Sequence, residues 1–453
     1  MRKYIVLKGP LALLPIAFFL LIFIGSGVYL TLQGVEYAFY KVSASVAILP
    51  ALILAVLLGR HSLSENIHVF LEGVREKNII TMCMIYLLAG AYTEVLKGIG
   101  GVEATVHFAL QFIPQEATLP GIFIIGAFVS TSMGTSMGTI AALAPIAAGI
   151  SQALGIHPAL MAGAVISGAM FGDNLSMISD TTIAATQIHP CSLKDKFNIN
   201  FMIALGPLVL TLLFFALSTH GETQALQESS SSPAFIFTFP YLFVLLLALL
   251  GINVFIVLSL GLVVGSLIGL IFAPSYTGLD LAKNIFEGYT SMNEILILSL
   301  LIGGLSELTK DQGGIRFLIQ GMDHFIKKWA KRAQGSRVAE GAISIIVSFC
   351  DVCTANNTVA IILAGEATYE ISKRYHILFA RTAALVDIFS CVFQGILPYS
   401  AQVLLAGSIA KVSPLSIVPH VYYCYFLGLG AVIAIIFRWP SSRGMKNLDG
   451  TIL

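Results

Sequence analysis

The chain has 453 residues, of which 57% are hydrophobic and only 11% are charged, and its formal net charge is +1. Soluble domains carry about 25% charged residues, so this composition excludes an ordinary soluble protein and indicates a membrane protein with many spans. No basic domain is present, which argues against a nucleic-acid partner.

Apolar segments of spanning length follow one another along the chain. At about 20 residues per span, the length fits a bundle of about ten to twelve helices. The first apolar run could pass for a signal peptide, but it is too long and lacks a convincing cleavage site, so we expect a first span. The expected spans are Leu11–Leu32, Val42–Gly59, Ile79–Leu96, Phe201–Thr219, Ala234–Leu250, Asn253–Ala273, Ile295–Leu308 and Leu415–Phe437.

Two further stretches, Leu119–His189 and Val338–Lys411, are apolar but interrupted by polar clusters. Lys and Arg concentrate in some connections and are nearly missing from others, so the positive-inside rule places the basic connections and both termini in the cytoplasm. All basic connections fall on the cytoplasmic side only if each interrupted stretch supplies one re-entrant hairpin and one broken transmembrane helix. The sequence therefore predicts an all-α polytopic protein of the cell (inner) membrane with ten spans, hairpins over 119–154 and 338–369, and broken helices over 158–188 and 380–411.

The two halves of the chain, residues 1–225 and 226–453, share residues in the same order. The matches are Glu72-Gly73 with Glu287-Gly288, Glu94 and Lys97 with Glu307 and Lys310, Thr135 and Thr139 with Thr354 and Thr358, and Phe171 and Leu175 with Phe393 and Leu397. Because the first half holds five spans, an odd number, the second half enters the membrane upside down. An inverted repeat of two five-span halves is typical of secondary transporters, whose site lies where the breaks meet. The alternative is chance matching in apolar sequence, which explains the Glu and Lys matches poorly.

Two carboxylates mark the first broken helix as a candidate ion site. A charge in the bilayer core costs about 2.5–3.5 kcal/mol on insertion scales, so an acid there is a functional candidate by default. Asp173 and Asp180 lie in the segment FGDNLSMISDTT, which would supply a hard cation with oxygen ligands if it is partly unwound. We therefore predict a Na⁺ or proton site at Asp173 and Asp180, accompanied by Asn174, Ser176 and Thr181. Asp180 could also cap a helix that begins near Thr181.

The other breaks are predicted to line the same site. The first hairpin carries STSMGTSMGT at 130–139, rich in hydroxyls, whereas the second carries DVCTANNT at 351–358, which offers amides and one acid. Pro398 interrupts the second broken helix, which has polar residues but no carboxylate of its own, Asp387 being the nearest acid. The predicted site-lining or substrate-binding residues are Ser132, Thr135, Ser136, Thr139, Asp351, Thr354, Asn356, Asn357, Asp387, Gln394, Tyr399 and Gln402. Cys350 and Cys353 have redox or metal spacing, but without a second pair or a His cluster they are better interpreted as small lining residues.

The segments GTSMGTIAALAPIA (134–147) and AGAVISGAMFGDNLSMISDTTIAAT (162–186) resemble the NhaC-type sodium/proton antiporter family of the ion-transporter superfamily. The resemblance implies Na⁺ export driven by H⁺ entry, with the coupling ion bound by the acids of GDNLSMISDTT. It also implies a scaffold-and-transport-domain fold that is often dimeric, so the expected partners are membrane lipid, Na⁺, H⁺ and, as an option, a second copy of the chain. No cofactor is predicted. Asn174 and Met177 stand where better-known members usually have Lys and Pro, and some relatives exchange carboxylates or carry amino acids, so an organic solute stays open.

The predicted function is Na⁺/H⁺ antiport by alternating access, in which Na⁺ and H⁺ compete for one buried carboxylate. The main alternative is a Na⁺- or H⁺-coupled carrier of an amino acid or small carboxylate, with Asn356, Asn357, Tyr399 and Gln402 on the solute. An intramembrane enzyme is disfavoured, because no HExxH, GxSxG or paired-Asp protease pattern stands in the polar stretches. A channel is disfavoured by the inverted hairpins.

Overall fold

The computed structural model describes residues 9–33, 41–59, 61–110, 114–177, 179–218, 235–314, 317, 321 and 335–440. Within these residues every regular element is a helix, which confirms the all-α class. The predicted boundary between the halves at 225–226 and both chain termini lie outside the described residues, so the boundary and the side of the membrane on which the termini lie stay predictions.

The helices follow the order of the apolar segments. The first part of the chain forms η1 (Gly9–Leu13), α1 (Leu14–Leu32), α3 (Ala44–Leu58), α4 (Leu63–Val74), α5 (Lys77–Gly98), α6 (Gly101–Leu110), η2 (Gln115–Ala117), α7 (Thr118–Met133), α8 (Ser136–Leu154), α9 (Pro158–Leu175), α10 (Asp180–Ile188) and α11 (Leu193–Ser218). The second part forms η4 (Phe235–Thr238), α12 (Phe239–Leu249), α13 (Val254–Phe272), α14 (Gly278–Ser291), α15 (Asn293–Asp311), α17 (Gly335–Thr354), α18 (Asn357–Arg374), α19 (Phe379–Ile396), α20 (Ala401–Ala410), α21 (Pro414–Ile417), η5 (Val418–His420) and α22 (Tyr422–Phe437).

Among the described residues, 6 helices are long and apolar enough to cross a membrane, or up to 8 when each bent helix pair counts as one span. This number indicates a multi-pass membrane protein. The predicted broken helix at 380–411 matches one apolar stretch, Phe379–Ala410, whose helix stops between α19 and α20. One element differs from expectation, because α8 alone has 19 residues and spanning hydropathy, whereas it was predicted to be one limb of a re-entrant hairpin. The count of ten spans and the re-entrant course of the hairpins stay predictions.

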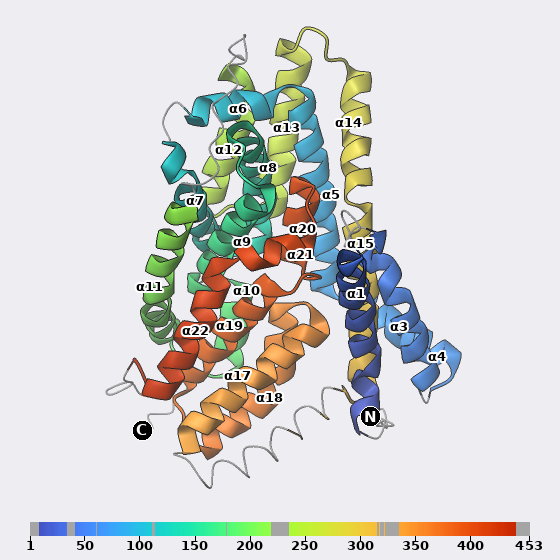
Figure 1. The fold of residues 1–453 in the computed structure, drawn as a ribbon, viewed down its shortest axis with the longest axis vertical. Coiled ribbons are helices and arrows are strands. Elements are labelled where there is room, and N and C mark those ends of the chain that lie inside the picture. The colour runs from blue at the N-terminus through green and yellow to red at the C-terminus, as the bar shows by residue number, and fades with distance from the viewer. Residues whose placement is uncertain are drawn as a thin grey trace.

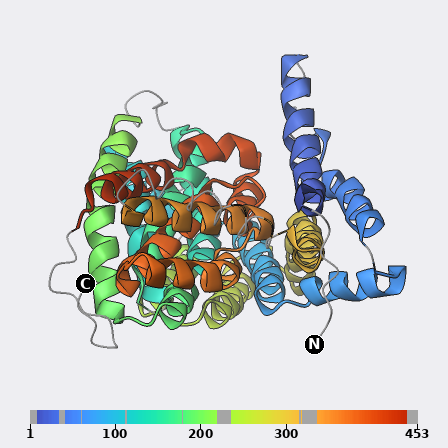
Figure 2. The ribbon, with the colours of Figure 1, turned by 90° about the horizontal axis from the view of Figure 1, so that it is seen from below.

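The helices form an arm, which consists of α1, α3, α4 and α15, and a larger body (Figures 1 and 2). In the arm, α1 packs against α3, and α15 packs against α3 and α4. Helix α5 lies between the arm and the body, and α14 packs against α5 above the arm in Figure 1. We call α1, α3, α4, α5, α14 and α15 the frame. In the body, α7 packs against α9 and α17 against α19, while α8 contacts α20 and α10 contacts α18.

Two glycine contacts join the helices of the frame. Gly73 of α4 meets Gly303 of α15, and Gly90 of α5 meets Gly288 of α14, so closely that a Cβ on Gly73 or Gly90 would collide with the facing backbone carbonyl. Gly73 and Gly288 belong to one predicted repeat match, and Gly90 and Gly303 each lie four residues before matched glutamates. The contact of Gly73 with Gly303 is therefore equivalent to the contact of Gly288 with Gly90, as a two-fold relation between the halves would produce. The inversion of one half stays a prediction, which the two contacts support.

The hairpin breaks have the same backbone geometry in both halves. Gly134 ends α7 in the left-handed conformation with φ 68°, and Ala355 follows α17 in the same region with φ 50°. The next residues, Thr135 and Asn356, are extended and precede α8 and α18. The members of each pair are 221 positions apart (355 − 134 = 221). A left-handed residue followed by an extended one therefore interrupts the helix at the same place in each half.

The breaks in the two broken helices keep the same spacing of 221 positions. Ser179 and Ser400 cap α10 and α20, and each side chain accepts a hydrogen bond from the backbone N–H three residues further on. At this spacing Asp173 corresponds to Gln394. The predicted hairpin match was therefore wrong by two positions, because it aligned threonines by type, whereas the left-handed residue at the break sets the register.

Candidate functional site

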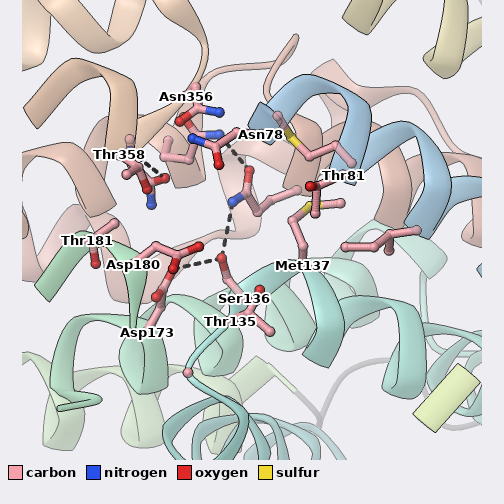
Figure 3. Close-up of a pocket in the computed structure, with 16 residues that line it drawn as sticks. Asn78, Thr81, Thr135, Ser136, Met137, Asp173, Asp180, Thr181, Asn356 and Thr358 are labelled. Atoms are coloured by element: carbon pink, nitrogen blue, oxygen red, sulfur yellow. Dashed lines mark hydrogen bonds between the residues drawn. The ribbon is translucent and has the colours of Figure 1, made fainter. Parts of the chain in front are cut away.

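The four breaks and α5 surround one small polar cavity (Figure 3). Its volume is about 80 Å³, far below the roughly 300–1,000 Å³ of pockets for drug-sized ligands. A space of this size suits an ion with a few waters or a very small solute. The lining residues are Asn78, Thr81, Met82 and Ile85 of α5; Gly134, Thr135, Ser136 and Met137 between α7 and α8; Asp173, Asp180 and Thr181 of α9 and α10; Asn356, Asn357 and Thr358 at the start of α18; and Gln394 and Gln402 of α19 and α20.

The cavity gathers residues that the sequence analysis drew from all four interrupted elements. The predicted residues that line it are Thr135, Ser136, Asp173, Asp180, Thr181, Asn356, Asn357, Gln394 and Gln402. The predicted residues that do not line it are Ser132, Thr139, Asn174, Ser176, Asp351, Thr354, Asp387 and Tyr399. The roles assigned to both groups stay predictions, but only the first group lies at the cavity.

Most of the predicted residues outside the cavity have local hydrogen-bond partners. The Thr139 and Thr354 hydroxyls donate to carbonyls one turn back in their own helices, at 3.0 and 2.9 Å. Ser176 donates to the Thr131 carbonyl at 3.0 Å, and Tyr399 donates to the Val352 carbonyl at 2.8 Å. These contacts shape the breaks and use the hydroxyl protons of the four side chains.

Two further predicted residues lie elsewhere. The Ser132 backbone carbonyl faces Gly251, where an added Cβ would approach it at 2.6 Å. Asp351 is completely buried in the last turns of α17, and neither of its carboxyl oxygens has a hydrogen-bond partner in the described part of the chain.

Asp173 lies in the last turn of α9 and faces the cavity. It is 5% exposed, and Ser136 Oγ donates a hydrogen bond of 2.8 Å to its Oδ2 atom. Ser136 begins α8 directly after the extended residue at the break, so the break itself aims this hydroxyl at the carboxylate. No cationic side chain bonds to Asp173 among the described residues. Its charge is therefore left for a mobile ion or a proton to neutralise.

Asp180 shares the cavity with Asp173 but has a different environment. It is exposed and opens α10, next to the capping residue Ser179. The alternative that Asp180 itself caps this helix is therefore replaced, because Ser179 accepts the hydrogen bond from the Thr182 N–H at 3.2 Å. A carboxylate in the first turn still interacts favourably with the helix dipole. Figure 3 shows Asp173 and Asp180 on the same side of the cavity.

A chain of hydrogen bonds runs from Asp173 through the other three breaks. Gln402 Nε2 donates to Ser136 Oγ at 3.1 Å, and Gln394 Nε2 donates both to Gln402 Oε1 at 2.6 Å and to the Ala355 carbonyl at 3.1 Å. Every donor along the side-chain part points toward Asp173, so the chain is polarised to stabilise a negative charge there. One ionisable group is thus connected to the first hairpin, both parts of the second broken helix and the second hairpin.

Asp387 was predicted to line the site, and the structure places it in a closed ion pair instead. Its Oδ2 atom accepts hydrogen bonds from Lys196 Nζ at 2.6 Å and from Asn200 Nδ2 at 2.9 Å, and both carboxylate and ammonium are buried. Because a cation of the protein already neutralises this charge, Asp387 is not free to exchange ions.

Sequence reasoning did not assign to the site the polar residues Asn78, Thr81 and Thr358, which line the cavity, or Lys196 beside it. Asn78 and Thr81 lie one helical turn apart in the first part of α5 and face the cavity from the frame. Lys196 was counted as part of a basic connection, yet α11 begins at Leu193 and buries it. Polar residues three apart at the start of an apolar helix were a usable signal for Asn78 and Thr81, whereas nothing local marks Lys196.

The cavity has two chemically different sides. Asp173, Asp180 and Ser136 supply carboxylate and hydroxyl oxygens on one side, and Asn78 and Asn356 supply amides on the other (Figure 3). Oxygens suit a hard cation. Amides can donate hydrogen bonds to an anionic group or complete the oxygen shell of a cation.

Three known proteins to which the chain is similar are named as antiporters, but for different ions and solutes. A sequence model of the Na⁺/H⁺ antiporter family matches residues 5–221. The chain is 25% identical over 426 residues to the Na⁺/H⁺ antiporter NhaC of Alkalihalophilus pseudofirmus, covering 88% of this chain and 90% of that protein. It is 23% identical over 469 residues to the malate-2H⁺/Na⁺-lactate antiporter of Bacillus subtilis, covering 97% and 98%. It is also 23% identical over 395 residues to the arginine/ornithine antiporter ArcD of Halobacterium salinarum, covering 79% and 77%.

Proposed function

The chain belongs to the NhaC-type Na⁺/H⁺ antiporter family, and on this premise we propose that it exchanges Na⁺ for H⁺ across the cell membrane by alternating access. The family consists of multi-pass membrane transporters and not of enzymes. The proposal adds the exchanged ions, the coupling residue and the movement to this family assignment. It retains the predicted orientation, with both termini in the cytoplasm, and a homodimer as an option.

Asp173 is the single observation that carries the proposal. Its carboxylate is buried, faces the cavity and has one neutral hydrogen-bond donor, Ser136. A buried charge with so little compensation calls for a bound cation or a proton. Asp180, Thr135 and Thr181 add further oxygens around the same small space. Na⁺ and H⁺ therefore compete for one group, and this competition couples their flows.

The hydrogen-bond chain couples the ionisation of Asp173 to the contacts between the breaks. When the carboxylate is ionised, Ser136 donates to it and Gln402 donates to Ser136. When Asp173 is protonated, its carboxyl group becomes a donor, so the Ser136 hydroxyl no longer needs to point at it. The contacts of Gln402 and Gln394 with both later breaks then change as well. Na⁺ and H⁺ would in this way favour different arrangements of the same four breaks.

The frame and the body supply the two parts that alternating access requires. Close glycine contacts join α4 with α15 and α5 with α14, which favours movement of the frame as one unit. The cavity lies between this frame, through Asn78 and Thr81 of α5, and the breaks of the body. Movement of the breaks past α5 would open the cavity first to one side and then to the other. The matched geometry of the breaks in the two halves supports such a two-way cycle.

A second candidate function is coupled exchange of a small amino acid or carboxylate. The amides of Asn78 and Asn356 face the two acids across the cavity, and Asn357 also lines it, an arrangement that suits a solute with an anionic and a cationic group. Two relatives are named as antiporters of malate with lactate and of arginine with ornithine. The volume of about 80 Å³ favours ions over these larger solutes.

Flux measurements on purified protein in proteoliposomes test the proposal. An imposed Na⁺ gradient should drive H⁺ movement in the opposite direction without any organic solute, and a pH gradient should drive ²²Na⁺. A panel of hydroxy acids, dicarboxylates and basic amino acids is added to matched vesicles. H⁺ movement that requires one of these solutes would replace the proposed antiport by the second candidate.

A further inference from the structure

Lys196 is a buried lysine of α11 that lies just outside the cavity. Only 1% of it is exposed, and its ammonium donates to Thr182 Oγ1 at 2.6 Å, Asp387 Oδ2 at 2.6 Å and the Asn174 carbonyl oxygen at 3.3 Å. A lysine ammonium has three N–H donors, so these three acceptors satisfy it completely. The group is therefore held in one place.

Two of the three acceptors lie on either side of the break in the first broken helix, and the third lies in the second half of the chain. Asn174 follows Asp173 directly in the last turn of α9, and Thr182 lies in the first turn of α10, two residues after Asp180. The third acceptor, Asp387, belongs to α19. The ammonium thus fills the polar gap at the break and links a neighbour of each cavity carboxylate to the other half of the chain.

Asn200 strengthens the same link from one helical turn further along α11. Its Nδ2 atom shares two N–H donors among three acceptors, the Asn174 carbonyl at 2.9 Å, Asn174 Oδ1 at 2.8 Å and Asp387 Oδ2 at 2.9 Å. Residues four apart share one face of a helix, so Lys196 and Asn200 act together. Two side chains of α11 therefore hold the same carbonyl at the end of α9 and the same carboxylate of α19.

Charge balance alone does not account for this arrangement. Neutralising Asp387 requires one contact with the ammonium, whereas two of the three contacts of Lys196 go to uncharged groups on either side of the break. Thr182 Oγ1 also donates to the Ser176 carbonyl at 2.8 Å, which joins the ammonium to the unwound segment itself. The position of the ammonium is therefore coupled to the path of the chain between Asp173 and Asp180.

We propose that Lys196 is a positioning residue, whose ammonium holds the ends of α9 and α10 so that Asp173 and Asp180 face the same cavity. It contacts neither carboxylate and acts through Asn174 and Thr182. The inference rests on the proposed function, because it assigns to Lys196 the geometry of the Na⁺ site. It also makes α19 part of the same rigid connection, so that the two broken helices keep their relative position while the ion is bound.

The test compares Na⁺ dependence with maximal rate in proteoliposomes. The double variant Lys196→Met with Asp387→Asn removes both charges together, so no unpaired charge is left inside. It should raise the Na⁺ concentration for half-maximal exchange by about tenfold or more, as loss of groups that orient the direct ligands of an ion typically does, with a smaller change in maximal rate. Thr182→Val removes one acceptor without changing charge and should also raise the Na⁺ concentration for half-maximal exchange. Lys194→Met, an exposed lysine of the same helix, is the matched control and should change neither.

A folded double variant with the wild-type Na⁺ dependence would overturn the inference and leave Lys196 as a purely structural partner of Asp387. If the double variant does not fold, Thr182→Val decides, and an unchanged half-maximal concentration would overturn the inference in that case. Wild-type protein that moves no H⁺ in response to Na⁺ would refute the proposed function, and the inference with it. A wild-type exchanger with unaffected variants would refute the inference alone.

Discussion

Asp173 and Asp387 are both buried acids near the first break, and their surroundings are opposite. The Asp387 oxygen Oδ2 receives an ammonium and an amide, at 2.6 and 2.9 Å, whereas the Asp173 oxygen Oδ2 receives one hydroxyl at 2.8 Å. Asp173 faces the cavity and Asp387 does not. A carboxylate that carries its own counter-charge serves the fold, and a carboxylate without one is available for exchange. Burial alone does not separate these two roles, but the partners do.

The largest effect should follow from breaking the closed pair. Asp387→Asn leaves the Lys196 ammonium buried without its counter-charge, and loss of one partner of such a pair costs about 3–5 kcal/mol of the free energy of unfolding. Asp173→Asn removes a charge that has no cationic partner and should leave stability unchanged or raise it. Thermal unfolding of both variants in the same detergent compares them directly. Equal losses of stability would mean that the two carboxylates do not differ as described.

An intermediate effect should follow from removing the one donor to Asp173. A hydrogen bond to a charged group contributes about 1.5–3 kcal/mol, and the Ser136 bond favours the ionised carboxylate over the protonated one. Ser136→Ala should therefore let H⁺ compete better with Na⁺ and raise the half-maximal Na⁺ concentration by about 10- to 100-fold. Ser151→Ala is the matched control, because Ser151 is also a buried serine of α8 but donates to the Ile156 carbonyl at 2.7 Å, outside the cavity. It should affect stability without affecting Na⁺ dependence. A similar rise in both variants would show that packing of α8, and not the hydroxyl, sets the affinity.

A smaller effect should follow from interrupting the hydrogen-bond chain one step further away. Gln402→Leu removes the donor to Ser136 and the acceptor for Gln394, both of them neutral bonds. A neutral hydrogen bond contributes about 1 kcal/mol, so the half-maximal Na⁺ concentration should rise about fivefold. Gln152→Leu, an exposed glutamine of α8, controls for the substitution. An unchanged value for Gln402→Leu would confine the influence on Asp173 to Ser136.

The sequence supported the helical class, the positions of the four breaks and most of the cavity lining, because these depend on local patterns. Hydroxyls, amides and Pro398 interrupt apolar runs, and Asp173 and Asp180 stand inside one such interruption. The segments predicted as broken helices, 158–188 and 380–411, contain α9 with α10 (158–175 and 180–188) and α19 with α20 (379–396 and 401–410). In this chain, a polar cluster inside an apolar segment therefore marked each of the four breaks.

The partners of the acids could not be predicted, because they depend on distant contacts. Lys196 and Asp387 are 191 positions apart, and Gln402 reaches Ser136 across 266 positions. Without these contacts both acids were assigned to the site, Asp173 to binding of the ion and Asp387 to the lining. Asn78 and Thr81 join the cavity only because α5 packs beside the breaks.

The central claim is that Na⁺ and H⁺ compete at Asp173, and Na⁺-driven H⁺ flux measured at several pH values tests it most directly. For the wild-type protein, the half-maximal Na⁺ concentration should rise as pH falls, because protonation of the carboxylate removes the charge that binds Na⁺. Asp173→Asn cannot be ionised and should move no H⁺ in response to Na⁺, while it stays folded. Undiminished, pH-dependent exchange by Asp173→Asn would contradict the account.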